Sequence, residues 1–388
     1  MLKLGGKVIE IQSVENAPST LLSISTNALL PLVLRKAKAY LVTQASVPEG
    51  FDHYLLLDSN RDLVSALPPN ASYTLLPEDY AYLGEGDVIR LSKERGMIRT
   101  LFRASSSHNS LLITEQCNHY CLMCSQPPKN IDDSWIIDEV KELIPLIPKD
   151  TKDIGFTGGE PTLYGERFLD ILRLAKSYLP RASIHVLSNG RTFKDLAFAQ
   201  SYANIEHHDI MVGIPLYSDD PAQHDYIVQA HGAFDETIRG ILNLKRLNQK
   251  VEIRVVIHKQ SIMRLKELCE FIARNLLFVD HVALMGLEMM GFTRANLDKL
   301  WIDPIEYKDI LSDAVGILAK NGMTVSVYNH QLCLVNPDII PFYRKSISDW
   351  KNEYAVECKG CSKMSECGGF FSSGIQYGYS KYIKPYVI

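Results

Sequence analysis

Three cysteines lie within eight positions of one short segment, TEQCNHYCLMCSQPPK. They are Cys117, Cys121 and Cys124, in a chain that has 8 cysteines among 388 residues. Thiolates are preferred ligands of both iron–sulfur clusters and zinc. A structural zinc site takes four ligands, and His119 would complete such a set. Three thiolates on a four-iron cube instead leave one iron open, which is what a catalytic centre requires.

Two further motifs follow the cysteine loop. In TGGEP, Gly158 and Gly159 let backbone groups come close to a ligand amine, while Glu160 accepts a hydrogen bond. In SNG, Ser188 and Asn189 offer a hydroxyl and an amide that suit the edge of a ribose. A GGE triplet alone is more typical of a turn. Here the GGE triplet lies one βαβ unit after a C-x3-C-x2-C loop, and in that position it indicates a binding site.

A second group of cysteines lies near the end of the chain. Cys358, Cys361 and Cys367 are spaced C-x2-C-x5-C, and Cys333 precedes them in NHQLCLVN. Four thiolates are enough for a closed [4Fe-4S] cluster or for a zinc site, and both readings stay open. Cys269, in RLKELCEFIARNLL, is predicted to be a buried apolar residue of a helix.

These motifs need a framework of strands and helices. The short apolar runs LLIT, DIGFTG, SIHVLSN, DIMVGIPL, VEIRVVI and HVALMGL are mostly separated by helical patterns. The clearest helix is FDETIRGILNLKRLNQ, with an apolar stripe predicted at Phe234, Ile238, Ile241 and Leu242. Strands that alternate with helices pair in parallel through right-handed crossovers. The sequence predicts an α/β protein with a partial (β/α)6 TIM-like barrel, whose chemistry collects at the C-terminal ends of the strands.

The chain divides into three predicted parts. Residues 1–105 form a small β-rich N-terminal domain, in which GDVIRLSKERGMIRTLFR reads as a hairpin. Residues 106–300 form the barrel, and residues 301–388 form a C-terminal extension with a helix, the strand MTVSVYN and the second cysteine group. An exposed strand edge in the first domain would suit pairing with an extended peptide.

Composition limits the function classes. The chain is 46% hydrophobic and 22% charged, as is ordinary for a globular protein, and its net charge is -4. No basic block stands out, so we expect no nucleic-acid partner. The start, MLKLGGKVIEIQ, lacks the apolar run of a signal peptide, and no window is long enough to span a bilayer. We therefore expect a cytoplasmic protein without a membrane partner, in which clustered cysteines serve metal binding or catalysis.

From about Asn109 to its end, the chain resembles the radical S-adenosylmethionine (SAM) enzymes. The resemblance implies that the three loop cysteines hold a [4Fe-4S] cluster, whose fourth iron binds the amino and carboxylate groups of SAM. It also implies contacts with the SAM amine and ribose from the two motifs above, namely Gly158, Gly159, Glu160, Ser188 and Asn189. Ser218, after GIPLY, and Arg254, in VEIRVVI, fall where the family often has further SAM contacts, although Arg254 is equally compatible with a solvated strand charge.

One departure from the family pattern precedes the third cysteine. Met123 stands where the family usually has an aromatic residue. Methionine is flexible and polarizable, so it suits packing against an adenine. The resemblance assigns no general acid or base, because hydrogen abstraction by a radical needs none by default.

The tail resembles the SPASM/Twitch extensions of peptide-modifying radical SAM enzymes. Full extensions carry two auxiliary clusters, whereas Cys333, Cys358, Cys361 and Cys367 suffice for one auxiliary [4Fe-4S] cluster. Four segments resemble one subgroup, the radical SAM maturase (C type) of the His-Xaa-Ser system: CLMCSQPPK, GIPLYSDDPAQHDYIVQAHGAFD, HVALMGLEMMGFTRANLDKLWIDP and YNHQLCL.

The subgroup resemblance implies a reaction and partners. The enzyme would cleave SAM reductively to a 5′-deoxyadenosyl radical and modify a ribosomally made precursor peptide with His-Xaa-Ser repeats. Its partners would be that peptide, a second radical SAM maturase, and an electron donor such as flavodoxin or ferredoxin. Two alternatives remain: a radical SAM enzyme that acts on a small molecule or a nucleoside, and a zinc- or cluster-stabilised binding protein without turnover.

Overall fold

The computed structural model describes residues 2–13, 19–345 and 352–387. Contacts within the chain divide it into two units. The first comprises residues 1–111, 138–154 and 174–182, and the second comprises residues 112–137, 155–173 and 183–388.

The N-terminal part of the first unit is built on an eight-stranded sheet with the order β1-β8-β7-β3-β4-β5-β6-β2. Its strands are β1 (Gly5–Lys7), β2 (Glu10–Gln12), β3 (Ser19–Ser25), β4 (Lys38–Leu41), β5 (His53–Leu57), β6 (Tyr73–Leu76), β7 (Val88–Ser92) and β8 (Met97–Phe102). Strands β7 and β8 pair antiparallel, which confirms the predicted hairpin. Buried aliphatic side chains such as Leu22, Ile24 and Leu55 form the core against one face of the sheet.

Both edges of this sheet come from one short segment, residues 5–12. Strand β1 pairs with β8, and β2 pairs with β6, each over three residues. Between them, Val8 N donates to Gly96 O and Ile9 N donates to Leu75 O, both at 2.9 Å. The exposed edge expected from the sequence is therefore only three residues long on either side.

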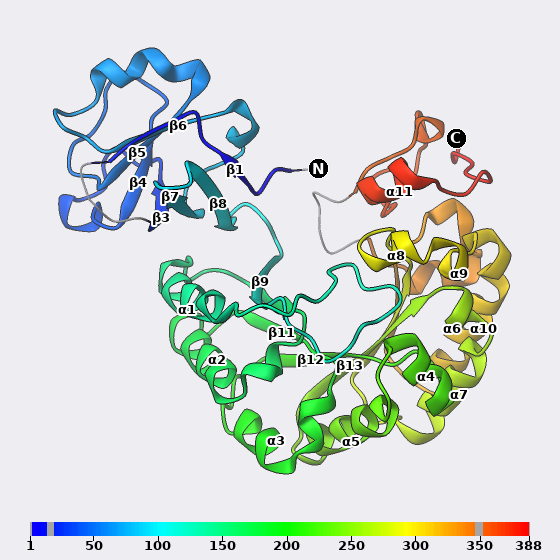
Figure 1. Ribbon diagram of the computed structural model, residues 1–388. Coiled ribbons are helices and arrows are strands. Elements are labelled where there is room, and N and C mark those ends of the chain that lie inside the picture. The colour runs from blue at the N-terminus through cyan, green and yellow to red at the C-terminus, as the bar shows by residue number, and fades with distance from the viewer. Residues whose placement is uncertain (1, 14–18, 346–351, 388) are drawn as a thin grey trace. The chain divides into compact units, whose positions relative to one another are not determined.

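The second sheet has seven strands in the order β15-β14-β13-β12-β11-β10-β9. They are β9 (Asn109–Thr114), β10 (Asp153–Gly158), β11 (Ser183–Leu187), β12 (Ile210–Pro215), β13 (Lys250–Ile257), β14 (His281–Gly286) and β15 (Val325–Tyr328). Strands β11 to β15 pair in parallel. The sheet curls into an open barrel, as Figure 1 shows. This is the partial α/β barrel that the sequence predicts, together with a β-rich N-terminal region.

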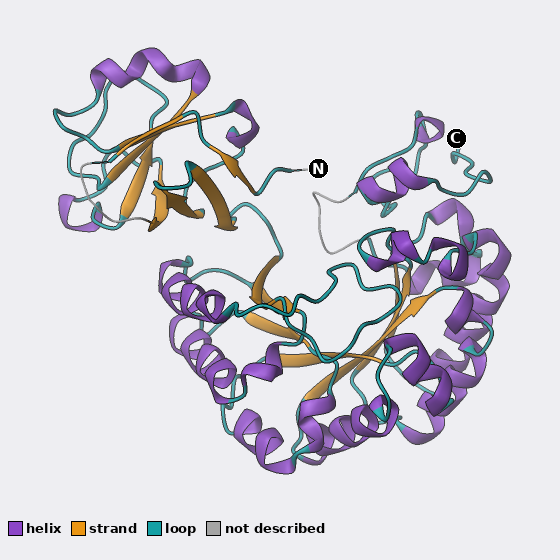
Figure 2. Cartoon of the chain, viewed as in Figure 1, coloured by secondary structure: helices purple, strands orange, loops and turns teal. Residues whose placement is uncertain are grey.

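Helices follow the strands and cover the outer side of the sheet, which Figure 2 shows in purple around the orange strands. They are α1 (Ser134–Leu143), α2 (Glu166–Tyr178), α3 (Leu196–Ala203), α4 (Pro221–Val228), α5 (Ala233–Arg246), α6 (Lys259–Ile262), α7 (Leu265–Asn275), α8 (Phe292–Ala295), α9 (Leu297–Leu300), α10 (Pro304–Lys320) and α11 (Ser372–Tyr377). Among the described residues, none of these helices is long and apolar enough to cross a bilayer.

The six predicted barrel strands all form, and one more joins them. Strand β15, which the sequence places in the extension after residue 300, pairs in parallel with β14 from Val282↔Val325 to Met285↔Tyr328. The barrel sheet therefore continues beyond the predicted boundary. Cys269 on α7 is fully buried, as predicted.

Candidate active site

A cavity of about 300 Å³ opens at the C-terminal ends of the barrel strands. The loop after β9 contributes all three clustered cysteines, Cys117, Cys121 and Cys124. The following strands and the segments directly after them contribute five more of the residues predicted to bind the cofactor: Gly158, Gly159, Ser188, Asn189 and Arg254. The side chains of Glu160 and Ser218 do not line it. Parallel strands bring these segments together because their C-terminal ends meet at one edge of the sheet.

The cysteine loop is held in place by backbone hydrogen bonds from two sides. Tyr120 N donates to Val228 O and Leu122 N donates to Ile227 O, both at 3.0 Å, at the end of α4. On the other side, Phe292 N, at the start of α8, donates to the carbonyl of Cys124 at 2.8 Å. These bonds fix a loop that has no regular secondary structure of its own, so its thiols have defined positions.

Met123 fills the core beneath this loop. It is 6% exposed, packs with Tyr217 and Leu300, and also lines the cavity. Its position beside the third cysteine allows the packing against a flat ring that the sequence suggests.

The three thiols suit a metal cluster on chemical grounds. Burial raises the pKa of Cys117 to about 11, and it also raises the pKa of Cys121 and Cys124. Thiolates, which are the ligating form, therefore need a strong positive charge beside them, and bound metal ions supply one. The backbone N–H of His119 also donates to Cys117 Sγ at 3.4 Å, the kind of bond that stabilises cluster sulfurs.

The glycine pair lies directly against the cysteine loop. A Cβ atom on Gly158, whose φ is +144°, would stand 2.2 Å from Thr114 O. A Cβ atom on Gly159 would stand 2.0 Å from Gln116 O and 3.1 Å from Cys117 Cβ. No side chain fits there, so the two glycines let the end of β10 pack directly against the cysteine loop, and Gly159 N donates to Thr114 O at 2.8 Å.

Glu160, which the resemblance places against the SAM amine, is buried among hydrogen-bond donors of the protein itself. Its carboxylate is fully buried and accepts hydrogen bonds from Thr162 N (3.0 Å), Thr162 Oγ1 (2.6 Å), Ser188 Oγ (2.9 Å) and Asn189 N (2.5 Å). Burial raises the pKa of this carboxyl, while those hydrogen bonds oppose the shift. The carboxylate thus ties the end of β10 to the end of β11, and its direct contact with a ligand amine stays a prediction.

Ser188 and Asn189 line the cavity but are also engaged with neighbours. Asn189 Nδ2 donates to Asn118 Oδ1 at 2.6 Å, and Asn189 Oδ1 accepts from Arg191 N at 3.0 Å. The SNG segment is thereby fixed against the cysteine loop. Its polar atoms are oriented before any ligand arrives.

Arg254 brings a positive charge to the cavity from β13. Its Nη1 atom donates to Glu252 Oε1 at 2.8 Å, and its Nη2 atom lies 3.3 Å from Met285 Sδ. The Arg254 guanidinium is therefore not the solvated strand charge that the sequence left open. A guanidinium in a cavity is suited to a ligand carboxylate.

Ser218 lies outside the cavity. It is 1% exposed, and its Oγ atom accepts from Asp220 N at 3.1 Å. The preceding residue, Tyr217, lines the cavity in its place. The predicted SAM contact of Ser218 stays a prediction.

The structure also places residues in the cavity that the sequence did not single out, namely Glu288 and Asn329. Glu288 follows β14, and Asn329 follows β15 with φ of +59°. The sequence signal for both is their place just after a strand, two residues after β14 for Glu288 and one residue after β15 for Asn329. Asn329 escapes this pattern in the sequence, because the strand before it lies in the predicted C-terminal extension and not in the predicted barrel.

The four cysteines of the tail also line one cavity. Cys333, Cys358, Cys361 and Cys367 line a second, apolar cavity of about 20 Å³. Gly369 N donates to Cys367 Sγ and Tyr386 N donates to Cys361 Sγ, each at 3.4 Å. Four thiols with backbone N–H donors are a donor set that fits a closed iron–sulfur cluster or zinc. No three Cys, His, Asp or Glu side chains in the described ranges are grouped as a site for a single metal ion.

Comparisons with known proteins give one family match and several structural similarities. Residues 111–272 match the family model of the radical SAM superfamily. A search of curated proteins gives no match. Among solved structures, anSMEcpe with bound AdoMet and Cp18Cys peptide aligns with 72% of this chain and 92% of its own, at 14% identity and a TM-score of 0.50.

Two other solved structures align over shorter regions. SuiB from Streptococcus suis, bound to S-adenosylmethionine, aligns over 59% of this chain at 16% identity and a TM-score of 0.47. The alignment spans about half of the SuiB chain, 51%. HemN from Escherichia coli, a coproporphyrinogen III oxidase and radical SAM enzyme, aligns over 55% of this chain and 52% of its own, at 14% identity and a TM-score of 0.44.

Proposed function

We propose that the chain is a radical SAM enzyme that binds a [4Fe-4S] cluster through Cys117, Cys121 and Cys124 and binds SAM in the same cavity. The observation that carries this proposal is the meeting of those three thiols with the Gly158–Gly159 backbone in one cavity at the C-terminal ends of the strands. When bound, the cluster and SAM supply a reductive cleavage that yields a 5′-deoxyadenosyl radical, which abstracts hydrogen from a substrate.

The roles proposed for the chain's own residues are to bind SAM and to orient it. Gly158 and Gly159 allow close approach of the β10 backbone to the cysteine loop, and Arg254 offers its guanidinium to the SAM carboxylate. Ser188 and Asn189 face the cavity and suit the ribose. Glu160 acts as a positioning residue, because its hydrogen bonds hold both strand ends.

We further propose that the substrate is a ribosomally made peptide with His-Xaa-Ser repeats. The support is the resemblance of the four segments given above to the His-Xaa-Ser maturase of C type. In addition, anSMEcpe, which shares the fold, has been solved with a bound peptide. A second radical SAM maturase and a donor such as flavodoxin or ferredoxin would complete the system, in the reducing cytoplasm that thiolate-bound clusters require.

The four tail cysteines would then hold an auxiliary [4Fe-4S] cluster. Support comes from their meeting in one apolar cavity with two N–H donors aimed at their sulfurs. Four thiolates close the coordination shell, so this cluster would not bind SAM and would be suited to electron transfer.

The first test is SAM cleavage. Anaerobically reconstituted protein with a strong reductant should form 5′-deoxyadenosine, and Cys117→Ala, Cys121→Ala and Cys124→Ala should each abolish it, because an iron loses its ligand. Cys269→Ala, which removes a buried helical thiol, is the matched control and should retain activity. Full activity in any of the three loop variants would refute the cluster assignment.

The substrate is tested separately. Incubation with a His-Xaa-Ser repeat peptide, followed by mass spectrometry, should reveal a mass change that depends on SAM and reductant. SAM cleavage without any change in the peptide would leave the enzyme class intact and favour a small molecule or a nucleoside. Absence of both iron and SAM cleavage would favour a zinc-stabilised binding protein.

A further inference from the structure

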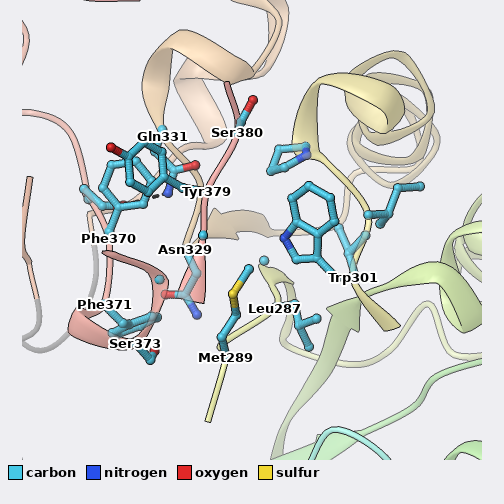
Figure 3. A pocket seen from close by; sticks show the side chains of 18 of the residues that line it. Leu287, Met289, Trp301, Asn329, Gln331, Phe370, Phe371, Ser373, Tyr379 and Ser380 are labelled. Atoms are coloured by element: carbon cyan, nitrogen blue, oxygen red, sulfur yellow. Dashed lines mark hydrogen bonds between the residues drawn. The ribbon is translucent and has the colours of Figure 1, made fainter. Parts of the chain in front are cut away.

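A third cavity, of about 70 Å³, lies next to the cavity of the three-cysteine loop. We call it the ring pocket. Figure 3 shows Trp301 on one side, with Phe370, Phe371 and Tyr379 across from it and Met289 and Leu287 below. The rings of Phe370 and Tyr379 pack together with centroids 4.9 Å apart. The walls are therefore largely flat aromatic faces, which favour stacking with another ring.

The polar atoms of the ring pocket are few and uncharged. Among the described residues that line it, none carries a formal charge. Gln331 Nε2 donates to Gly369 O at 2.8 Å, and Ser380 Oγ accepts from Tyr382 N at 3.1 Å. Ser373 is different, because it is 3% exposed and its Oγ atom has no hydrogen-bond partner among the described residues. A buried hydroxyl without a partner is costly, so it favours a ligand that supplies one.

The ring pocket adjoins both cysteine sites. It shares Gly286, Leu287 and Asn329 with the cavity of the three-cysteine loop. It shares Gln331, Gly369 and Phe370 with the cavity of the four tail cysteines. A group bound in the ring pocket would thus lie beside both cavities, where a substrate must be held during hydrogen abstraction and subsequent electron transfer.

We propose that the ring pocket binds one uncharged planar ring with a hydrogen-bonding atom, carried by a side chain of the peptide substrate. This inference rests on the proposed function and adds the chemistry of the residue that is held. The volume is about half that of the engineered cavity of about 150 Å³ that binds benzene, so it suits a single small ring such as imidazole. A cationic side chain would lose its hydration without gaining a partner charge. The ring stacks between Trp301 and the tail aromatics, and its polar atom pairs with Ser373.

Binding of side-chain analogues to the reconstituted protein tests this inference. Saturation-transfer NMR is recorded at about pH 9, where the imidazole is neutral and the alkylammonium is still charged, with 4-methylimidazole, toluene and butylammonium, and excess SAM is present to occupy the open iron. 4-Methylimidazole should bind most tightly, toluene more weakly, and butylammonium not measurably. Tighter binding of butylammonium than of 4-methylimidazole would overturn the proposal.

Two variants test whether 4-methylimidazole binds in the ring pocket. Gly374 lines it, and a Cβ atom there meets only Phe370 atoms at an ordinary 3.7 Å, so Gly374→Leu fills the pocket from the helix α11. Gly316→Leu on α10 is the matched control, since a Cβ atom at that helical glycine meets nothing within 4 Å. Gly374→Leu should weaken 4-methylimidazole binding at least about tenfold, and Ser373→Ala about threefold to tenfold, as expected for one lost hydrogen bond.

The outcomes separate this inference from the proposed function. Unchanged binding of 4-methylimidazole to Gly374→Leu would show that the ring pocket is not its site. SAM cleavage by the wild type is measured on the same samples. If cleavage is absent while binding follows the expected pattern, the proposed function fails and the ring pocket remains a ligand site. Far-ultraviolet circular dichroism checks that each variant is folded.

Discussion

At the scale of single residues, Glu160 shows that the carboxylate of a GGE motif can serve two roles, to contact a ligand or to join two strand ends. The sequence shows a carboxylate beside two glycines, and from this alone a contact with a ligand amine is a reasonable prediction. The structure gives that carboxylate four hydrogen bonds from its own and the neighbouring strand end. Two of these bonds, from Ser188 and Asn189, join residues 28 and 29 positions apart, so no local pattern reveals them.

Replacing Glu160 should therefore affect folding and SAM binding together. Glu160→Ala leaves buried N–H and O–H donors without an acceptor, and we expect a loss of about 3 kcal/mol in the free energy of unfolding. SAM affinity should fall in parallel, because Ser188 and Asn189 lose their support. Glu160→Gln should show a smaller loss of both, since its amide nitrogen cannot accept.

Anaerobic urea denaturation and equilibrium dialysis of SAM measure the two quantities. If Glu160→Gln binds SAM much more weakly at unchanged stability, the carboxylate contacts SAM directly, as the family resemblance implies.

At the scale of elements, the barrel strands carry an ionic group on their inner side. Glu252 on β13 contacts Arg254 (2.8 Å), His281 on β14 (2.6 Å) and His185 on β11 (3.5 Å). Burial alone would raise the pKa of Glu252, but His281, Arg254 and His185 outweigh it and lower the pKa to about 2. Three strands thus fix the carboxylate that in turn orients the cavity-lining Arg254.

The pKa of Glu252 predicts a pH dependence of stability. Its folded value lies below the ordinary value of 4.5, so its contribution is present above about pH 4.5 and is lost as the pH falls toward 2. Glu252→Gln should lower the free energy of unfolding at pH 7 by on the order of 3 kcal/mol. The difference from the wild type should narrow below pH 4.5, as followed by urea denaturation. Glu270→Gln, an exposed change on α7, is the control, and a gap that widens toward low pH would contradict the assignment.

Local patterns predicted most elements, and long-range pairing explains the rest. The hairpin β7–β8 and the helices α5 and α7 follow from turn residues and apolar periodicity within one segment. Leu242, expected on the buried stripe of α5, is instead 46% exposed, while Leu244 is fully buried. The period of 3.6 residues places both near the edge of the stripe, and only the packed neighbour decides which one is covered. Pairing of β15 with β14 depends on partners more than 40 residues apart.

At the scale of the whole molecule, the division into units differs from the simple order of domains along the chain. Residues 138–154 and 174–182 group with the N-terminal sheet, although the sequence assigns them to the barrel. Within that unit, the buried Glu139 of α1 accepts from Arg90 and Arg99 of the hairpin, each at 2.7 Å. Ion pairs of this kind join elements 40 or more positions apart. Residues 1–105 therefore share one compact unit with residues 138–154 and 174–182.

Two cysteine sites in one chain make the iron content a test of the whole arrangement. Wild-type protein reconstituted anaerobically should hold about eight irons per chain, as two four-iron clusters require. A triple Cys358/Cys361/Cys367→Ala variant should drop to about four irons, because the tail cluster loses three of its four ligands. The first cluster should survive, since the tail cysteines do not line its cavity.

SAM cleavage should therefore persist while the peptide product is lost, if the tail cluster accepts an electron from the substrate. Cys269→Ala, at the remaining cysteine, should leave the iron content unchanged. Four irons and one zinc in the wild type would instead make the tail a structural zinc site and exclude electron transfer through it.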